Sequence, residues 1–92
     1  MSALYGFAYA ESALKYLETV VPAKFRGQIK RKVELLASNP NPPGSKKLQG
    51  LMEGDEPVFR IRSGDYRILY VVRNNPDQIV VLDIGHRKDV YR

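Results

Sequence analysis

The spacing of apolar residues changes along the chain from a helical period to a strand period. After a short β-prone run over Leu4–Tyr9, apolar residues recur at helical spacing from about Ala10 to Val20, which predicts a first helix. A second helix is expected to begin near Pro22, because the missing proline N–H needs no partner at a first helical position. Its expected buried stripe consists of Phe25, Ile29, Val33 and Leu36.

Prolines end this helical half of the chain. The segment Asn39–Gly44 contains Pro40, Pro42 and Pro43, and proline supplies no N–H and disfavours a helical conformation in the residue before it. We expect the following stretch, Ser45–Glu56, to be a polar loop. Its expected anchors are Leu48, Leu51 and Met52.

Runs of β-prone residues occupy most of the second half of the chain. They cover Val58–Arg62, Tyr66–Arg73 and Gln78–Gly85. Between the first two, the Ser63–Tyr66 segment has glycine at its first central position, which is typical of a type II′ hairpin. One strand, a two-helix hairpin and a three-stranded antiparallel meander predict an α+β fold, with the helices packed on one sheet face. The other face is expected to stay at least partly open.

Alternation along these strands predicts that Arg60, Arg62 and Arg67 share the open face. The hairpin would place Arg62 directly opposite Arg67. Like charges in that position destabilise a sheet by about 0.2–1 kcal/mol. Arg87 would join this face if the last strand has the necessary register. The helices are expected to contact Val80, Leu82 and Ile84.

Two interpretations of the arginine cluster are open. In the first, the arginines form a solvated face with Asp65, Asp83 and Asp89 as partners. In the second, they form a phosphate clamp, because planar guanidinium groups make paired hydrogen bonds to phosphate oxygens. We favour the clamp, since the charges have one sign and converge.

Several other residues are candidates for chemistry or binding. His86 is a potential general acid or base, although a lone histidine at a strand end is more often structural. Tyr91 could stack on a base, donate a proton or close the edge of the core. Lys46 and Lys47 either extend the basic surface or simply solubilise the loop.

Composition narrows the class of protein. The chain has 92 residues, expected to form a single domain over residues 1–92, and a formal net charge of +5. A small basic domain favours polyanionic partners such as nucleic acid, the ribosome or an acidic protein. The absence of cysteine excludes a disulfide framework and a thiol nucleophile. The chain shows neither a signal peptide nor an apolar run long enough to span a bilayer, so we expect a cytoplasmic protein without membrane contact.

No other catalytic constellation stands out in the sequence. There is no glycine-rich phosphate loop, no HExxH motif and no plausible Ser-His-Asp order. Glu53, Asp55 and Glu56 cluster, but without further ligands they resemble an ordinary acidic loop more than a magnesium site. We therefore expect neither a metal nor another cofactor.

Three segments together resemble the RelE group of the RelE/ParE toxin superfamily: the stretch 46–51 (KKLQGL), the hairpin 62–67 (RSGDYR) and the ending 85–92 (GHRKDVYR). The resemblance covers nearly the whole chain and implies a RelE-like fold. It further implies the toxin of a type II toxin–antitoxin system, an endoribonuclease that cuts mRNA in the ribosomal A site. In that family the ribose 2′-hydroxyl attacks the adjacent phosphate and no metal takes part.

The resemblance also implies roles for individual residues. Arg67 and Arg87 match the catalytic arginines of the family, and Tyr91 matches its C-terminal catalytic tyrosine. Arg60 stands where some members carry a catalytic lysine, and Val58 stands where some carry a second one. A guanidinium group stays protonated and is a poor base, so the proton acceptor is uncertain. His86 is one candidate for that role.

Partners and rival functions follow from the same resemblance. The expected partners are a cognate acidic antitoxin similar to RelB and mRNA in the ribosomal A site. The expected assemblies of toxin and antitoxin include a heterotetramer. One alternative is a non-enzymatic inhibitor of DNA gyrase, as in the ParE branch. Another is a degenerate toxin that binds RNA but does not cleave it. The expected RNA-binding residues are Arg62, Lys46 and Lys47.

Overall fold

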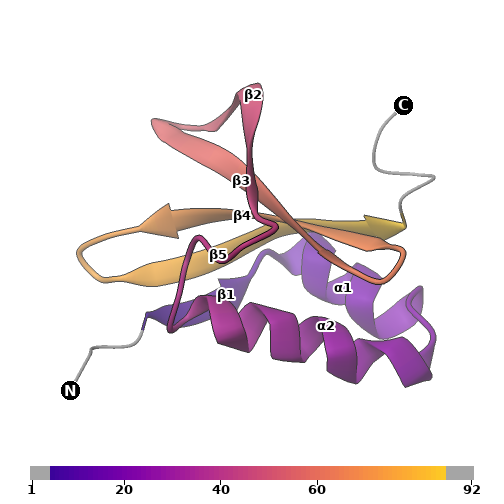
Figure 1. Cartoon of the computed structure of the whole chain (residues 1–92). Coiled ribbons are helices and arrows are strands. Elements are labelled where there is room, and N and C mark those ends of the chain that lie inside the picture. The colour runs from indigo at the N-terminus through magenta and orange to yellow at the C-terminus, as the bar shows by residue number, and fades with distance from the viewer. Residues whose placement is uncertain (1–4, 87–92) are drawn as a thin grey trace.

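The computed structural model describes residues 5–86 and has a five-stranded sheet with two helices on one face (Figure 1). The strand order across the sheet is β1-β5-β4-β3-β2, with β1 parallel to β5 and every other pair antiparallel. The predicted α+β class is confirmed. Along the chain the elements are β1 (Gly6–Tyr9), α1 (Glu11–Thr19), α2 (Ala23–Leu36), β2 (Lys46–Glu53), β3 (Glu56–Ser63), β4 (Tyr66–Arg73) and β5 (Gln78–His86).

The core lies between the helices and the sheet. The expected stripe of α2 is largely confirmed, because Ile29, Val33 and Leu36 are fully buried and Phe25 is half-buried against them. The strands contribute to this core through the side chains of Ile61, Ile68, Tyr70, Ile79, Val81 and Ile84.

The end of the first helix differs from the prediction. Ala13 and Leu17 of α1 are fully buried, as their spacing indicates, but Val20 is 56% exposed. The helix ends at Thr19, so Val20 leaves the buried stripe and Val21 enters the core instead. Pro22 is the N-cap of α2, one position before the helix proper.

The prediction of a polar loop over Ser45–Glu56 is wrong in part, because Lys46–Glu53 forms the edge strand β2. It pairs with β3, with an irregularity between Lys47 and Met52, and this end of the sheet rises away from the plane of β4 and β5 (Figure 1). Leu51 and Met52 are exposed and anchor nothing. An edge strand with almost every side chain in solvent has no apolar alternation, which is the signal that predicts strands.

Strand β5 contains a bulge that the sequence reading missed. Its pairing with β4 runs through Leu69 opposite Asp83 and then jumps to Tyr70 opposite Val81, so Leu82 is an extra residue. An extra residue of this kind reverses the alternation of faces beyond it.

The bulge explains why the expected core row of β5 is wrong. Val80 and Leu82 are only half-buried, whereas Ile79 and Val81 are fully buried against the helices. Ile84 lies beyond the bulge, where the alternation has changed, and is buried as expected.

Hydrogen bonds tie the connecting segments to the sheet. The hydroxyl of Tyr70 donates to the carbonyl of Pro40 at 2.7 Å, which fixes the proline-rich segment after α2 to a central strand. Burial raises the pKa of Tyr70. The backbone N–H of Ala10 donates to the carbonyl of Val81 at 2.8 Å and fixes the start of α1 on β5. Within residues 5–86, neither helix is long and apolar enough to cross a membrane.

Candidate functional site

The β3–β4 hairpin brings arginines of two strands together on the face opposite the helices. Ser63 pairs with Tyr66 and Arg62 pairs with Arg67, which confirms the predicted register. Arg60 comes two positions before Arg62 in β3 and pairs with Leu69 of β4. Residues two positions apart in a strand point to the same side, so Arg60 lies on the same face as Arg62.

The turn of this hairpin depends on Gly64. Its φ is +59°, a conformation that glycine adopts without penalty, and an added Cβ would meet no atom within 4 Å. We expect Gly64→Ala to lower the free energy of unfolding by about 1–2 kcal/mol through backbone strain alone. Gly27 offers the opposite case, because it lies inside α2 with equal space around it.

Gly27→Ala should therefore raise the free energy of unfolding by about 0.5–1 kcal/mol. Urea denaturation of both variants measures the contrast. Equal shifts in the same direction would contradict the assignment of the strain to the turn.

Burial and hydrogen bonding distinguish the arginines from an ordinary solvated face. Arg62 is exposed, while Arg60 is half-buried and its Nε is shielded from solvent without a hydrogen-bond partner among residues 5–86. A buried donor left unsatisfied costs about 1–3 kcal/mol. Within the same residues, neither Arg60 nor Arg62 pairs with a carboxylate, whereas Arg73 at the far end of β4 binds Glu56 at 2.8 Å. These observations favour the anion clamp over the neutralised face.

The two lysines of β2 separate in the structure. Lys46 pairs directly with Arg60 and therefore extends the arginine face by one strand. Lys47 pairs with Phe59, whose side chain packs against the core on the helix side of the sheet. Both lysines are exposed, but only Lys46 shares a face with the arginines.

His86 lies on the opposite face from the arginines. It pairs with Tyr66, and the two rings meet edge to face with centroids 5.4 Å apart. The backbone N–H of His86 donates to the hydroxyl of Tyr16 at 3.1 Å. The sheet therefore separates this histidine from Arg60 and Arg67, and its geometry supports a structural role.

Tyr66 completes this aromatic contact on the helix side. Its ring centroid lies 6.0 Å from that of Phe25. Burial raises the pKa of Tyr66, and Tyr16 and Asp65 raise it further, so its hydroxyl keeps its proton at neutral pH. The remaining predicted catalytic residues, Arg87 and Tyr91, lie outside the described residues.

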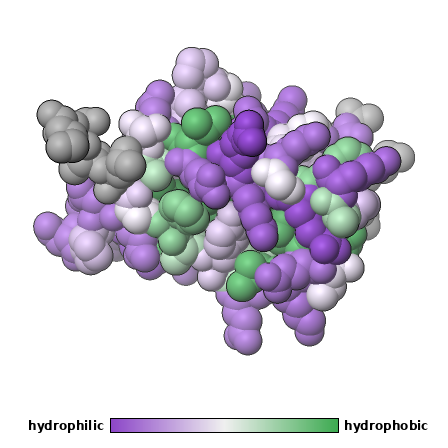
Figure 2. All heavy atoms as spheres, turned by 90° about the horizontal axis from the view of Figure 1, so that it is seen from below, coloured by the Kyte–Doolittle hydropathy of each residue, from purple (hydrophilic) through white to green (hydrophobic). Residues whose placement is uncertain are grey.

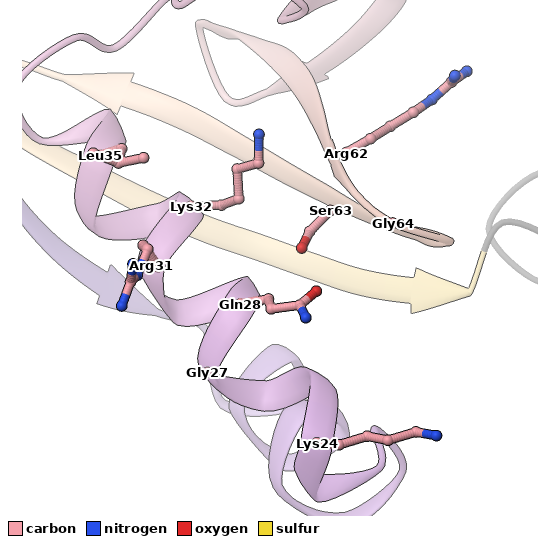
Figure 3. A pocket seen from close by; sticks show the side chains of 9 residues that line it. All are labelled: Lys24, Gly27, Gln28, Arg31, Lys32, Leu35, Arg62, Ser63 and Gly64. Carbon is pink, nitrogen blue, oxygen red and sulfur yellow. The ribbon is translucent and has the colours of Figure 1, made fainter.

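A basic groove of about 690 Å³ lies between α2 and the β3–β4 turn (Figure 3). No carboxylate lines it, and Lys24 sits in the first turn of α2, which holds no acidic residue. The positive end of the helix dipole adds to the charge of that lysine. Figure 3 shows Ser63 pointing toward α2 and Arg62 pointing away from it. The groove is lined by Lys24, Gly27, Gln28, Arg31, Lys32, Leu35, Arg62, Ser63 and Gly64.

Sequence reasoning missed this groove, although part of its signal is visible in the sequence. Lys24 and Arg31 are seven positions apart, which places them on one face of a helix, and Lys32 directly follows Arg31. Seen from the helix side, hydrophilic side chains cover most of the molecule, with apolar areas between them (Figure 2). Within residues 5–86 no group of His, Asp or Glu side chains is arranged to hold a metal ion.

Comparison with known proteins agrees with this fold. Residues 7–91 match the family described as the ParE toxin of the type II toxin–antitoxin system parDE. The chain is 32% identical over 79 residues to the RelE1 protein of Methanocaldococcus jannaschii, covering 86% of each.

Two solved structures of similar chains are toxin–antitoxin complexes. The RelE–RelB complex of Pyrococcus horikoshii OT3 contains a chain with a TM-score of 0.77 and 26% identity, covering 95% of this chain and 99% of that one. The RelB–RelE complex of Methanococcus jannaschii contains a chain with a TM-score of 0.64 and 32% identity, covering 90% and 93%.

The protein belongs to the ParE toxin family and is the toxin of a type II toxin–antitoxin system. Within the RelE/ParE superfamily it is a RelE-type toxin, which confirms the predicted membership of the RelE group.

Proposed function

We propose that this toxin is an endoribonuclease that cuts mRNA in the ribosomal A site. The observation that carries the proposal is the direct pairing of Arg62 with Arg67, with the buried and unsatisfied Nε of Arg60 on the same face. Like charges held side by side destabilise the free protein, and a phosphodiester between them would remove this cost. We further propose that the toxin acts in the cytoplasm, where its substrate is translated.

The proposed reaction is attack of a ribose 2′-hydroxyl on the adjacent phosphate. The transition state carries more negative charge on the phosphate oxygens than the ground state does. Guanidinium groups fixed in position by two paired strands would stabilise that charge without reorganising during the reaction. By resemblance to the family, Arg87 and Tyr91 would complete the site.

The proposed partner in the cell is an acidic antitoxin similar to RelB. The net charge of +5 and the basic face favour an acidic chain, and the structural relatives named above are bound to RelB. We expect the toxin to copurify with the product of a neighbouring reading frame, including as a heterotetramer.

A purified system tests the activity directly. The toxin is mixed with ribosomes that carry a defined mRNA, with the same mRNA alone, and with DNA gyrase in a supercoiling assay. We expect cleavage within the A-site codon only in the presence of ribosomes, and no effect on gyrase. Inhibition of supercoiling without RNA cleavage would overturn the proposal in favour of ParE-like inhibition.

The basic groove should contribute to binding of the ribosome–mRNA complex but not to the chemical step. We expect the double variant Lys24→Gln, Arg31→Gln to weaken binding and to flatten the plot of log affinity against log salt concentration by about 0.7–0.9 per lost phosphate contact. The single-turnover cleavage rate at saturation should stay unchanged. The variant Lys15→Gln on α1, which lies outside the groove, is the control.

Binding measured over a range of potassium chloride concentrations supplies the salt plot. An unchanged slope in the double variant would exclude phosphate contacts in the groove.

A further inference from the structure

The proposed reaction requires a group that accepts the proton of the 2′-hydroxyl. On the arginine face, guanidinium groups stay protonated and a lysine is ordinarily charged at neutral pH. Val58 is 2% exposed and has no polar atom to offer. His86 lies on the other side of the sheet, paired with Tyr66. The obvious candidates for the proton acceptor are therefore excluded among the described residues.

Asp83 lies on the arginine face. It pairs with Leu69, and Leu69 pairs in turn with Arg60 on its other side. Paired residues of neighbouring strands point to the same side of the sheet. Lys46 pairs with Arg60, so these residues form one row across β2, β3, β4 and β5.

Arg67 is the diagonal neighbour of Asp83 in the next row. It pairs with Gly85, which has no side chain to fill the space beside it. Diagonal residues on antiparallel strands lie roughly 7–8 Å apart between Cα atoms. A phosphate held by Arg67 would therefore have its ribose within reach of the Asp83 carboxylate.

The bulge in β5 is what brings Asp83 to this face. Ile79 and Val81 are fully buried against the helices, so uninterrupted alternation would point Asp83 into the core as well. The extra residue Leu82 reverses the alternation, and Asp83 is exposed as a result. Bulges that redirect a side chain in this way are frequent beside active sites.

The Asp83 carboxylate is also available to bind a ligand on this face. Glu56, at the other end of the sheet, is bound to Arg73 at 2.8 Å. Within residues 5–86 the Asp83 side chain makes no ion pair, although Arg67 lies on the neighbouring strand β4 and Arg60 on β3, the next strand across the sheet. An exposed carboxylate that stays unpaired beside arginines can accept a hydrogen bond from a ligand hydroxyl.

We propose that Asp83 is the catalytic residue that accepts the 2′-hydroxyl proton, an inference that rests on the proposed ribonuclease function. The 2′-oxygen forms a bond to phosphorus while its proton moves to the Asp83 carboxylate, and the bond from phosphorus to the 5′-oxygen breaks. The leaving 5′-oxygen takes a proton from water. Asp83 then returns its proton to the hydroxide so formed.

Single-turnover cleavage on mRNA-programmed ribosomes tests this role with the full-length toxin. We expect Asp83→Asn to reduce the rate constant by about 10²–10⁴-fold, the usual contribution of a positioned acid or base. Asp83→Glu should recover part of the rate, because it restores a carboxylate. Asp55→Asn, in the exposed turn between β2 and β3, should cleave at the wild-type rate.

The pH dependence separates proton transfer from a structural effect. The wild-type rate should fall at acid pH as the acceptor becomes protonated, and Asp83→Asn should lose this dependence. The wild type and Asp83→Asn should bind equally well to ribosomes whose mRNA has a 2′-O-methyl group at the cleavage position. Equal binding would also show that the variant is folded. Cleavage by Asp83→Asn within threefold of wild type, or with an unchanged pH profile, would overturn the role of Asp83.

A wild-type toxin that binds these ribosomes without cutting would instead overturn the ribonuclease function and this inference with it.

Discussion

Arg67→Ala should reduce the single-turnover rate of mRNA cleavage on the ribosome by about 10²–10³-fold, the loss typical of removing one donor that stabilises transition-state charge. Arg67 lies opposite Arg62 and diagonal to Arg60, so it is central to the arginine face. The same variant should relieve growth arrest in cells that express the toxin without its antitoxin.

Arg73→Ala is the matched control for this prediction. Arg73 belongs to the same strand, β4, but binds Glu56 at 2.8 Å at the opposite end of the sheet. A partly exposed ion pair of this kind contributes about 0–1 kcal/mol to stability, so this variant should fold and cleave as the wild type does. Equal activity of wild type and Arg67→Ala would disprove the phosphate clamp.

Ile68→Ala should lower the free energy of unfolding by about 2–5 kcal/mol, as expected for an isoleucine truncated in a close-packed core. Ile68 is fully buried in the central strand, between Arg67 and Leu69 in the chain, and pairs with both Ile61 and Ile84. The core beneath the arginine face therefore depends on this side chain.

Urea denaturation followed by circular dichroism measures this loss, and Leu51→Ala provides the comparison. Leu51 is 44% exposed on the edge strand β2, so its truncation should change the free energy of unfolding by less than about 0.5 kcal/mol. Similar losses for both variants would contradict the location of the core between helices and sheet.

The sequence predicts those parts of the fold that have a local signal. The stripe of Ile29, Val33 and Leu36 has a helical period and is found buried. The hairpin around Gly64 has a characteristic turn residue and is found in the predicted register. The shared face of Arg60, Arg62 and Arg67 follows from that register by alternation alone.

The parts that were missed lack a local signal. β2 has no alternation because it lies at an edge with both faces in solvent. The bulge at Leu82 could not be seen, since its apolar side chain suits either face of a strand. The wrong core row in β5 follows from that single extra residue.

The basic groove could not be predicted either, because it forms only when α2 and the β3–β4 turn lie side by side. Among the predicted site residues, Lys46 joins the arginine face through the pairing of β2, and Lys47 does not. The roles of Arg87 and Tyr91 stay predictions.

The edge strand β2 has a consequence for the evolution of this toxin. No side chain of β2 is fully buried, and most are exposed, so substitutions there, except at Gly50 with its φ of +72°, should change stability by about 0.5 kcal/mol or less. Yet its first residue, Lys46, borders the proposed RNA site through Arg60. Under the proposed function, we expect drift along this strand to alter codon preference or antitoxin choice while the helices and central strands stay the same.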